Sequence, residues 1–391
     1  MQWVKRIVFA VVVLIILAAA IFFTFGPEIV ENRQNGMKPH EAYPITEEAQ
    51  KLHDSLLIGD LHADSLLWKR DLTKRWDRGH TDIPRLIEGN VGFQVYTAVT
   101  KSPAGQNYEK NSAETRDNIT ILAIAQLWPV RTWNSLLQRA LYQAEKLHGF
   151  EAKVPDKLKI INSIDDLEEV ISRRANGEKI VGTILGIEGA HPLEGKFENL
   201  KVLTDAGYRL IALQHFFDNE LGGSLHGEED HGLTEFGRQV VTAVAGQKLI
   251  LDVAHSSEQV VRDVLEITDI PFVVSHTGIR SHCDVKRNIP DTLMQQIAAR
   301  GGLVGIGYWK DVTCNDSPAG VAAAINAAIE VVGGDHVSLG SDYDGAVTVA
   351  FDASELAALT QALMDIGLSE TQIRKVMGEN MVRLLRERLG N

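Results

Sequence analysis

Short apolar runs recur along this chain, each ends in polar residues, and helix-like segments separate them. The runs that we predict as strands are Leu56–Asp60, Gly92–Val99, Ile180–Ile187, Leu210–Gln214, Leu249–Val253, Phe272–Ser275, Leu303–Gly307 and Val337–Gly340. Continuous apolar strands that alternate with helices indicate a parallel sheet covered on both faces. Eight such units in 391 residues predict an α/β fold, a TIM-like (β/α)8 barrel.

An open, doubly wound sheet is the alternative fold, but no Gly-x-Gly-x-x-Gly motif follows the first apolar run. Helix starts support the alternation. Ser163 to Asp166 and Ser369 to Gln372 resemble capping boxes, and Thr234 precedes another helical stretch. The tail from Glu355 to Leu389 is predicted to be helical and to complete the outer ring.

The N-terminus carries an uncharged apolar run from Ile7 to Gly26, preceded by Lys5 and Arg6. Twenty residues of helix span roughly 30 Å, enough to cross the hydrocarbon core of a bilayer. A cleaved signal peptide is the alternative, but apolarity continues past the small residues Ala18–Ala20. We therefore predict a transmembrane anchor at 7–26, with residues 1–6 in the cytoplasm.

The rest of the chain is predicted to be exported, to the periplasm or the extracellular space. Residues 27–43 carry Pro, Asn, Glu and Lys without periodicity and indicate a linker, and residues 44–391 indicate one barrel domain. A net charge of −13 with no basic stripe beyond residue 30 argues against a nucleic-acid partner.

Six of the eight predicted strands end in an imidazole or a carboxylate, at the edge where a parallel barrel places its active site. These residues are His62, Asp64, Glu188, His215, His255, His276 and Asp342. Residues two apart in an extended chain point to the same side, so His62 and Asp64 could converge on one ion. Taken singly, each of these residues is more often a loop, capping or core residue.

Histidine and carboxylate ligands without cysteine suit a catalytic Zn²⁺ site. A bridging glutamate can hold two ions, which lower the pKa of a bound water near neutral pH. The chain has no Gly-x-Ser-x-Gly motif, so a metal-activated water is favoured over a covalent nucleophile. Mn²⁺ and Co²⁺ accept the same ligands. The two cysteines, Cys283 and Cys314, are compatible with one disulfide in an exported domain.

From about Ser55 to the C-terminus, the chain resembles the membrane (renal) dipeptidase family, which are binuclear zinc peptidases of the amidohydrolase type. The motifs that carry the resemblance are Gly59–Asp64, Gly186–His191, Leu213–His215, Leu251–Ser256, Ser275–His276 with Lys286–Asp291, and Gly340–Gly345. Departures from the family pattern include Leu61 before the first histidine, Ser65-Leu66 after Asp64, and Gln214 before His215.

The resemblance implies a role for each site residue. One zinc would be held by His62, Asp64 and bridging Glu188, and the other by Glu188, His255 and His276. His215 would stabilise the developing oxyanion, Arg287 would hold the substrate's terminal carboxylate, and Asp342 would contact the free amino group or transfer a proton. The resemblance also implies a disulfide between Cys283 and Cys314, and a homodimer.

The leading hypothesis is zinc-dependent hydrolysis of dipeptides, including those with a D-residue at the C-terminal side. Two alternatives stay open at this stage. One keeps the metal site but acts on N-acyl amino acids, lactones or other small amides. The other is a non-catalytic, anchored binding protein. The loop from His226 to His231 is either a second metal site or, as we favour, a solvated loop near the cleft.

Overall fold

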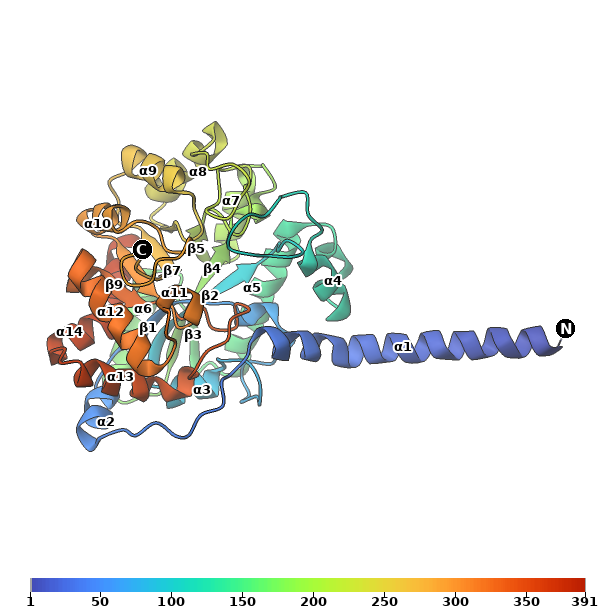
Figure 1. Ribbon diagram of the computed structural model, residues 1–391, viewed down its shortest axis with the longest axis horizontal. Coiled ribbons are helices and arrows are strands. Elements are labelled where there is room, and N and C mark those ends of the chain that lie inside the picture. Colours follow the sequence, from blue (N-terminus) through green and yellow to red (C-terminus); the bar gives the residue numbers. More distant parts are fainter. Residues whose placement is uncertain (1, 391) are drawn as a thin grey trace.

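The computed structural model describes residues 2–390 and has a closed parallel barrel at its centre (Figure 1). The strands are β1 Ile58–Ala63, β2 Val91–Val99, β3 Leu158–Ile160, β4 Val181–Glu188, β5 Tyr208–Ala212, β6 Ile250–Asp252, β7 Val273–Thr277, β8 Leu303–Ile306 and β9 Val337–Leu339. Strand β2 pairs directly with β4, and β1 pairs with both β2 and β9, so the sheet closes on itself. The predicted barrel is confirmed.

Strand β3 pairs only with β4 and lies outside the closed ring. The sequence does not predict this strand, because three residues are too few to show a strand pattern. The eight strands of the ring are the eight predicted runs, with ends shifted by a few residues. Most of their residues are buried, as expected for parallel strands covered by helices.

Helices surround the barrel and close its amino end. They are α2 Glu47–Asp54, α3 Ile83–Glu88, α4 Asn118–Ala125, α5 Leu136–Lys153, α6 Ile164–Ala175, α7 Glu198–Asp205, α8 Glu235–Gly246, α9 Glu258–Ile267, α10 Asp291–Ala299, α11 Lys310–Thr313, α12 Pro318–Val332, α13 Leu356–Asp365, α14 Glu370–Arg374 and α15 Asn380–Arg388. The predicted helix starts are confirmed. Ser163 and Ser369 form capping boxes, and the Thr234 side chain accepts from the backbone N–H of Gly237.

The helical tail is in three parts, and its last helix does not join the outer ring. Helix α13 packs against α12 and α2 in the ring. Helix α15 instead covers the amino ends of the strands, where Asn380 donates to the carbonyl of Val337 and Arg388 donates to that of Leu249. The amino end of the barrel is therefore closed, and the carboxyl end is left for the site.

The N-terminal helix α1, Gln2–Gln34, projects from the domain as a long rod (Figure 1). An 18-residue window of it has a mean hydropathy of 3.2, and no residue in that window is buried. By length and composition, this helix could cross a membrane. A signal sequence near an N-terminus would satisfy the same criterion.

The predicted linker at 27–43 is wrong in its first part, because residues 27–34 continue α1. Glu31 is 1% exposed and forms ion pairs with Arg70 and Arg78 of the barrel domain. Beyond the helix, the backbone N–H of Val349 donates to the carbonyl of Gly36. Buried ion pairs and backbone hydrogen bonds hold this segment to the barrel. Because apolar side chains contribute little to the contact, the segment lacks the apolar periodicity that identifies a docked helix in a sequence.

A disulfide joins Cys283, which follows β7, to Cys314, which follows α11, as the family resemblance implied. The two residues are 31 positions apart. A cross-link over a loop of this length stabilises the fold by roughly 3–4 kcal/mol through the unfolded chain. We expect the double variant Cys283→Ser/Cys314→Ser to unfold at a clearly lower temperature than the oxidised protein. Identical melting with and without reductant would contradict this expectation.

Candidate metal centre and substrate pocket

The carboxyl end of the barrel gathers the residues that the sequence singled out. His62 lies in β1, Glu188 ends β4 and His276 lies in β7. The others follow their strands within three residues. All of them are buried, with exposed fractions of 7% or less: His62, Asp64, Glu188, His215, His255, His276 and Asp342. The structure therefore brings every predicted ligand into one cluster.

Glu188 is at the centre of the cluster. Its Oε1 lies 3.2 Å from Nε2 of His255, 3.4 Å from Nε2 of His276 and 3.7 Å from Nε2 of His215. Its Oε2 lies 3.5 Å from Nε2 of His62. Both carboxylate oxygens thus face imidazole nitrogens on different strands, the geometry required of a ligand that bridges two ions.

The converging ligand atoms form overlapping groups. His62, Asp64 and Glu188 form one group with all atoms within 4.8 Å, and the His62–Asp64 separation is 3.6 Å. The Nε2 atoms of His255 and His276 are 2.9 Å apart and face the same Glu188 oxygen. These are the two predicted ligand sets.

His215 and Asp342, which have predicted roles other than metal binding, lie as close to the cluster as the candidate ligands do. His215 groups with Glu188 and His255, and Asp342 groups with His62 and His276. Asp342 lies 3.9 Å from Nε2 of His62. The candidate catalytic groups therefore lie in direct reach of the candidate ligands.

The electrostatics of the cluster suit a bound cation. Burial, together with the charge of Glu188, raises the pKa of Asp64 to about 7 and raises that of Asp342 well above its usual value. Burial lowers the pKa of His255 and His276, which leaves neutral imidazoles with a lone pair for a metal. Crowded carboxylates and neutral imidazoles are a donor set that a divalent ion would stabilise.

Two hydroxyl groups orient the candidate ligands. Ser275 Oγ lies 3.2 Å from Nδ1 of His62 and 2.9 Å from Nδ1 of His276, which leaves both Nε2 atoms to face the cluster. Thr97 Oγ1 donates to Asp64 Oδ1 over 2.5 Å. Such outer partners fix the tautomer and the direction of a ligand. Serine and threonine are common in strands, so neither residue stands out in the sequence.

Two buried aspartates brace the loops that carry the ligands. Asp60 accepts from the backbone N–H groups of His62 and Ser341, over 2.9 and 3.0 Å. Asp252 accepts from those of Ala254 and Ser275, over 2.9 and 3.0 Å. Each aspartate thereby ties together two neighbouring strand ends. The sequence motifs contain Asp60 and Asp252, but this bracing role depends on contacts between strands and does not show in the sequence.

The backbone is strained at two of the site residues. His255 has φ 62° and Asp342 has φ 60°, the left-handed region that side chains with a Cβ seldom adopt. Strained conformations of this kind persist where the surrounding structure enforces them, and they cluster at functional sites.

Arg287 lies beside the histidines and is 1% exposed. Its Nη2 donates to the carbonyl of His276 over 2.7 Å and lies 3.3 Å from Nε2 of His255. Its Nε is buried without a hydrogen-bond partner, and within residues 2–390 no carboxylate forms an ion pair with it. A buried guanidinium next to the cluster is thus available for an anionic group.

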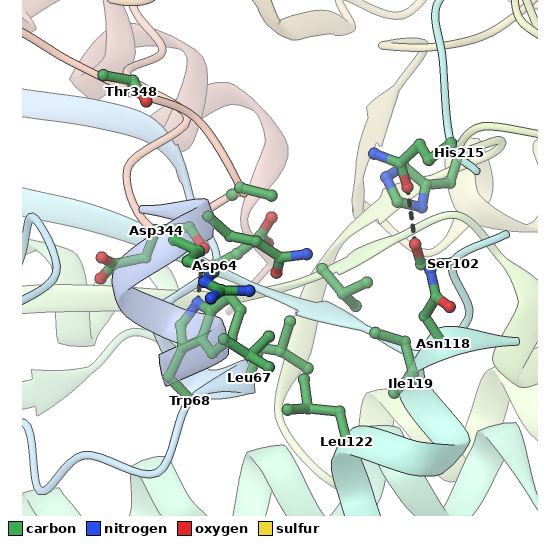
Figure 2. Close-up of a pocket in the computed structure, with 17 residues that line it drawn as sticks. Asp64, Leu67, Trp68, Ser102, Asn118, Ile119, Leu122, His215, Asp344 and Thr348 are labelled. Atoms are coloured by element: carbon green, nitrogen blue, oxygen red, sulfur yellow. Dashed lines mark hydrogen bonds between the residues drawn. The ribbon is translucent and has the colours of Figure 1, made fainter. Parts of the chain in front are cut away.

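A cavity of about 410 Å³ opens from the cluster (Figure 2). Asp64 and His215 line it at the cluster, and Leu67, Trp68, Val99, Ile119 and Leu122 give it an apolar surface. In Figure 2, Asp64, Leu67 and Trp68 lie on one side of the cavity, and His215, Ser102 and Ile119 on the other. Residues at the end of α1 also line it, which the sequence did not predict.

The loop at 226–231 does not form a second metal site among the residues that the structure describes, since none of the converging groups includes it. His226 is fully buried, and its ring stacks on Phe216. Glu228 to Asp230 are exposed to solvent. The loop therefore packs one histidine near the site and presents its acids to water.

A parallel (β/α)8 barrel with histidines and carboxylates converging at its carboxyl end defines a metal-dependent hydrolase. Residues 46–389 match the family model for membrane dipeptidase, peptidase family M19. The chain belongs to this family, and it is accordingly a metallo-dipeptidase.

Relatives and solved structures agree with this assignment. The chain is 28% identical to dipeptidase aclJ of Aspergillus oryzae, over 94% of this chain and 85% of that protein. It is 26% identical to dipeptidase ataJ of Aspergillus terreus, over 79% of this chain and 77% of that protein. The crystal structure of the M19 metallopeptidase dipeptidase AC superposes with a TM-score of 0.71 at 26% identity, covering 86% of this chain and all of the other.

Proposed function

We propose that this chain is an anchored, binuclear zinc dipeptidase with its site at the carboxyl end of the barrel. His62, Asp64 and Glu188 hold one Zn²⁺, and Glu188, His255 and His276 hold the other. The observation that carries the proposal is Glu188, whose two carboxylate oxygens face imidazoles from both ligand sets. The nitrogen and oxygen ligands, with both cysteines engaged in a disulfide, suit catalytic zinc.

When bound, the two ions would supply Lewis-acid polarisation and a water activated at neutral pH. His215 faces the cluster through Nε2 and would donate a hydrogen bond to the oxyanion that develops at the scissile carbonyl. Asp342, in the same cluster, would transfer a proton to the leaving amine or bind the free amino group. The chain's own groups thus position the substrate and move protons.

Recognition of both substrate termini would restrict the enzyme to dipeptides. Arg287 binds the C-terminal carboxylate, since its guanidinium is buried beside the cluster and has no ion-pair partner among the described residues. Asp342, in the loop after β9, contacts the amino group. A longer peptide would place an uncharged peptide bond beside Arg287 or Asp342, where a dipeptide places a charged terminus.

Dipeptides with a D-residue at the C-terminal side are included in the proposal. A metallopeptidase of Rhodobacter sphaeroides with the same fold, 24% identical with a TM-score of 0.68 over 85% of this chain and 99% of the other, was solved with a phosphinate mimic of L-Ala-D-Ala. The related activity on N-acyl amino acids, lactones or other small amides is the second candidate. Hydrolysis of N-blocked or amidated dipeptides would favour this second activity over the dipeptidase activity.

We further propose that α1 stays attached as a membrane anchor, with the barrel on the exported side. The support is the docked end of the helix, where Glu31 pairs with Arg70 in the barrel domain. A signal peptide would be removed from the mature protein, whereas here one unbroken helix runs from the apolar stretch into the docked segment. The homodimer that the family resemblance implied stays a prediction, which the mass of the purified chain in solution would test.

The role of Arg287 can be tested with Arg287→Lys, which keeps the charge and loses the bidentate fork. We expect kcat/KM for L-Ala-D-Ala and L-Ala-L-Ala to fall by about 10²-fold, with zinc content and melting temperature unchanged. Any residual activity on the amidated dipeptides should be unaffected. Equal losses on free and amidated substrates would contradict the role in binding the carboxylate.

A further inference from the structure

The last turn of the N-terminal helix forms part of the substrate pocket. Val30, Arg33 and Gln34 of α1 line the same cavity as Asp64 and His215. A helix that could cross a membrane therefore ends within the wall of the site, and Figure 1 shows it meeting the barrel domain at that end. An anchor that served only for attachment would need no such contact.

Buried contacts hold this wall to the loop that follows β9. Glu31 pairs with Arg70, and Arg70 in turn pairs with Asp344, two residues after Asp342. The side chain of Asn35 accepts from the backbone N–H of Ala346 over 2.9 Å. The end of α1 is thus fixed relative to a loop that carries a candidate catalytic residue, so its side chains have a defined place in the pocket.

The pocket contains one uncommitted positive charge. Of the acids that line it, Asp344 is fully buried and paired with Arg70, and Asp64 belongs to the candidate metal centre. Arg33 is exposed to solvent and, within the described chain, has no ion-pair partner, whereas Glu31, two residues earlier, has two. Gln34, Gln106 and Asn118 add neutral polar groups.

The place of Arg287 indicates which part of a substrate would occupy this cavity. Arg287, the proposed partner of the C-terminal carboxylate, does not line the cavity. The cavity therefore accommodates the other half of the dipeptide. Its apolar surface from Leu67 and Trp68 fits the methylene groups of a side chain, and Arg33 fits an anionic group at the end of one.

We propose that Arg33 of the anchor helix is a specificity-determining residue that favours dipeptides with an acidic N-terminal side chain. This inference rests on the proposed dipeptidase function and adds a substrate class to it. Because Arg33 is solvent-exposed, its charge is screened, and the expected discrimination is modest, at about fivefold.

The test uses the full chain in detergent, loaded with zinc, because removal of α1 would remove the wall. Glu-Ala and Gln-Ala have nearly the same shape and differ in one charge. In Arg33→Gln we expect the ratio of kcat/KM for Glu-Ala to that for Gln-Ala to fall about fivefold. Arg33→Lys, which keeps the charge, should retain part of the preference for Glu-Ala. The matched control is Asn32→Asp, which changes the net charge by the same amount at an exposed helix position outside the pocket lining.

The outcomes separate this inference from the proposed function. A lower ratio in Arg33→Gln and an unchanged ratio in Asn32→Asp support it. An unchanged ratio in both variants, or the same drop in both, overturns it and leaves the dipeptidase proposal in place. Failure of the zinc-loaded wild type to hydrolyse either dipeptide overturns the proposed function, and this inference with it.

Discussion

Glu188→Gln is expected to abolish hydrolysis and to lower the amount of bound metal. The substitution keeps the size of the side chain and removes the charge that both proposed ions share. The four imidazoles around it, His62, His215, His255 and His276, would then face a neutral amide. We expect kcat/KM to fall by on the order of 10³-fold or more, measured with zinc content on the same preparation.

The matched control for this variant is Glu228→Gln. Glu228 is an exposed acid in the loop at 226–231, so its substitution should change neither the zinc content nor the turnover. If Glu188→Gln bound two zinc ions per chain and kept its activity within tenfold, Glu188 would not be the bridging ligand. Loss of zinc in Glu228→Gln would instead reopen the loop as a metal site.

Arg70→Met is expected to destabilise the fold strongly. Arg70 is 3% exposed and pairs with two buried carboxylates, Glu31 from α1 and Asp344 from the loop after β9. Removal of one partner from a buried charge network typically costs about 3–5 kcal/mol, because the remaining charges lose their compensation. The loss would appear as a large drop in melting temperature. The exposed pair at Arg75 offers a control, since Arg75→Met should cost at most about 1 kcal/mol.

The effect of Arg70→Met should depend on pH with a definite sign. In the wild type, burial would raise the pKa of Asp344, but Arg70 and the neighbouring donors outweigh it and hold that pKa below the usual value. Asp344 therefore stabilises the fold above its unfolded pKa, and this contribution is lost as the pH falls. Without Arg70, both carboxylates favour protonation in the folded state, so the variant should recover stability as the pH is lowered towards about 4. A defect that is constant from pH 8 to pH 5 would contradict this account.

The barrel and its ligands could be predicted because they depend on local patterns. A buried parallel strand must be apolar, and a charged or imidazole side chain at its end is conspicuous against that background. His255 and His276 were found in this way, one after each of two neighbouring strands. Strand β3, Leu158–Ile160, was missed because it is short and lies outside the ring.

Features that depend on distant contacts could not be predicted. Nothing within residues 27–34 shows that Glu31 contacts Arg70, so the sequence pattern predicts a linker where the docked end of α1 lies. Ser275 and Thr97 orient the candidate ligands by hydrogen bonds. Both residues lie in strands, where serine and threonine are common, so their sequence positions do not indicate this role. The closeness of His215 and Asp342 to the ligands depends on backbone conformations after the strands, including the left-handed Asp342.

The central claim is that two zinc ions, bridged by Glu188, make this chain hydrolyse dipeptides. The most direct test is to measure zinc content and hydrolysis together on the purified full chain, before and after chelation, with L,L and L,D dipeptides and their N-blocked and amidated forms. We predict two zinc ions per chain, activity that is lost to the chelator and restored by zinc, and hydrolysis only of substrates with both termini free. A folded chain with two zinc ions and no turnover, or one that hydrolyses only the blocked substrates, would contradict the account.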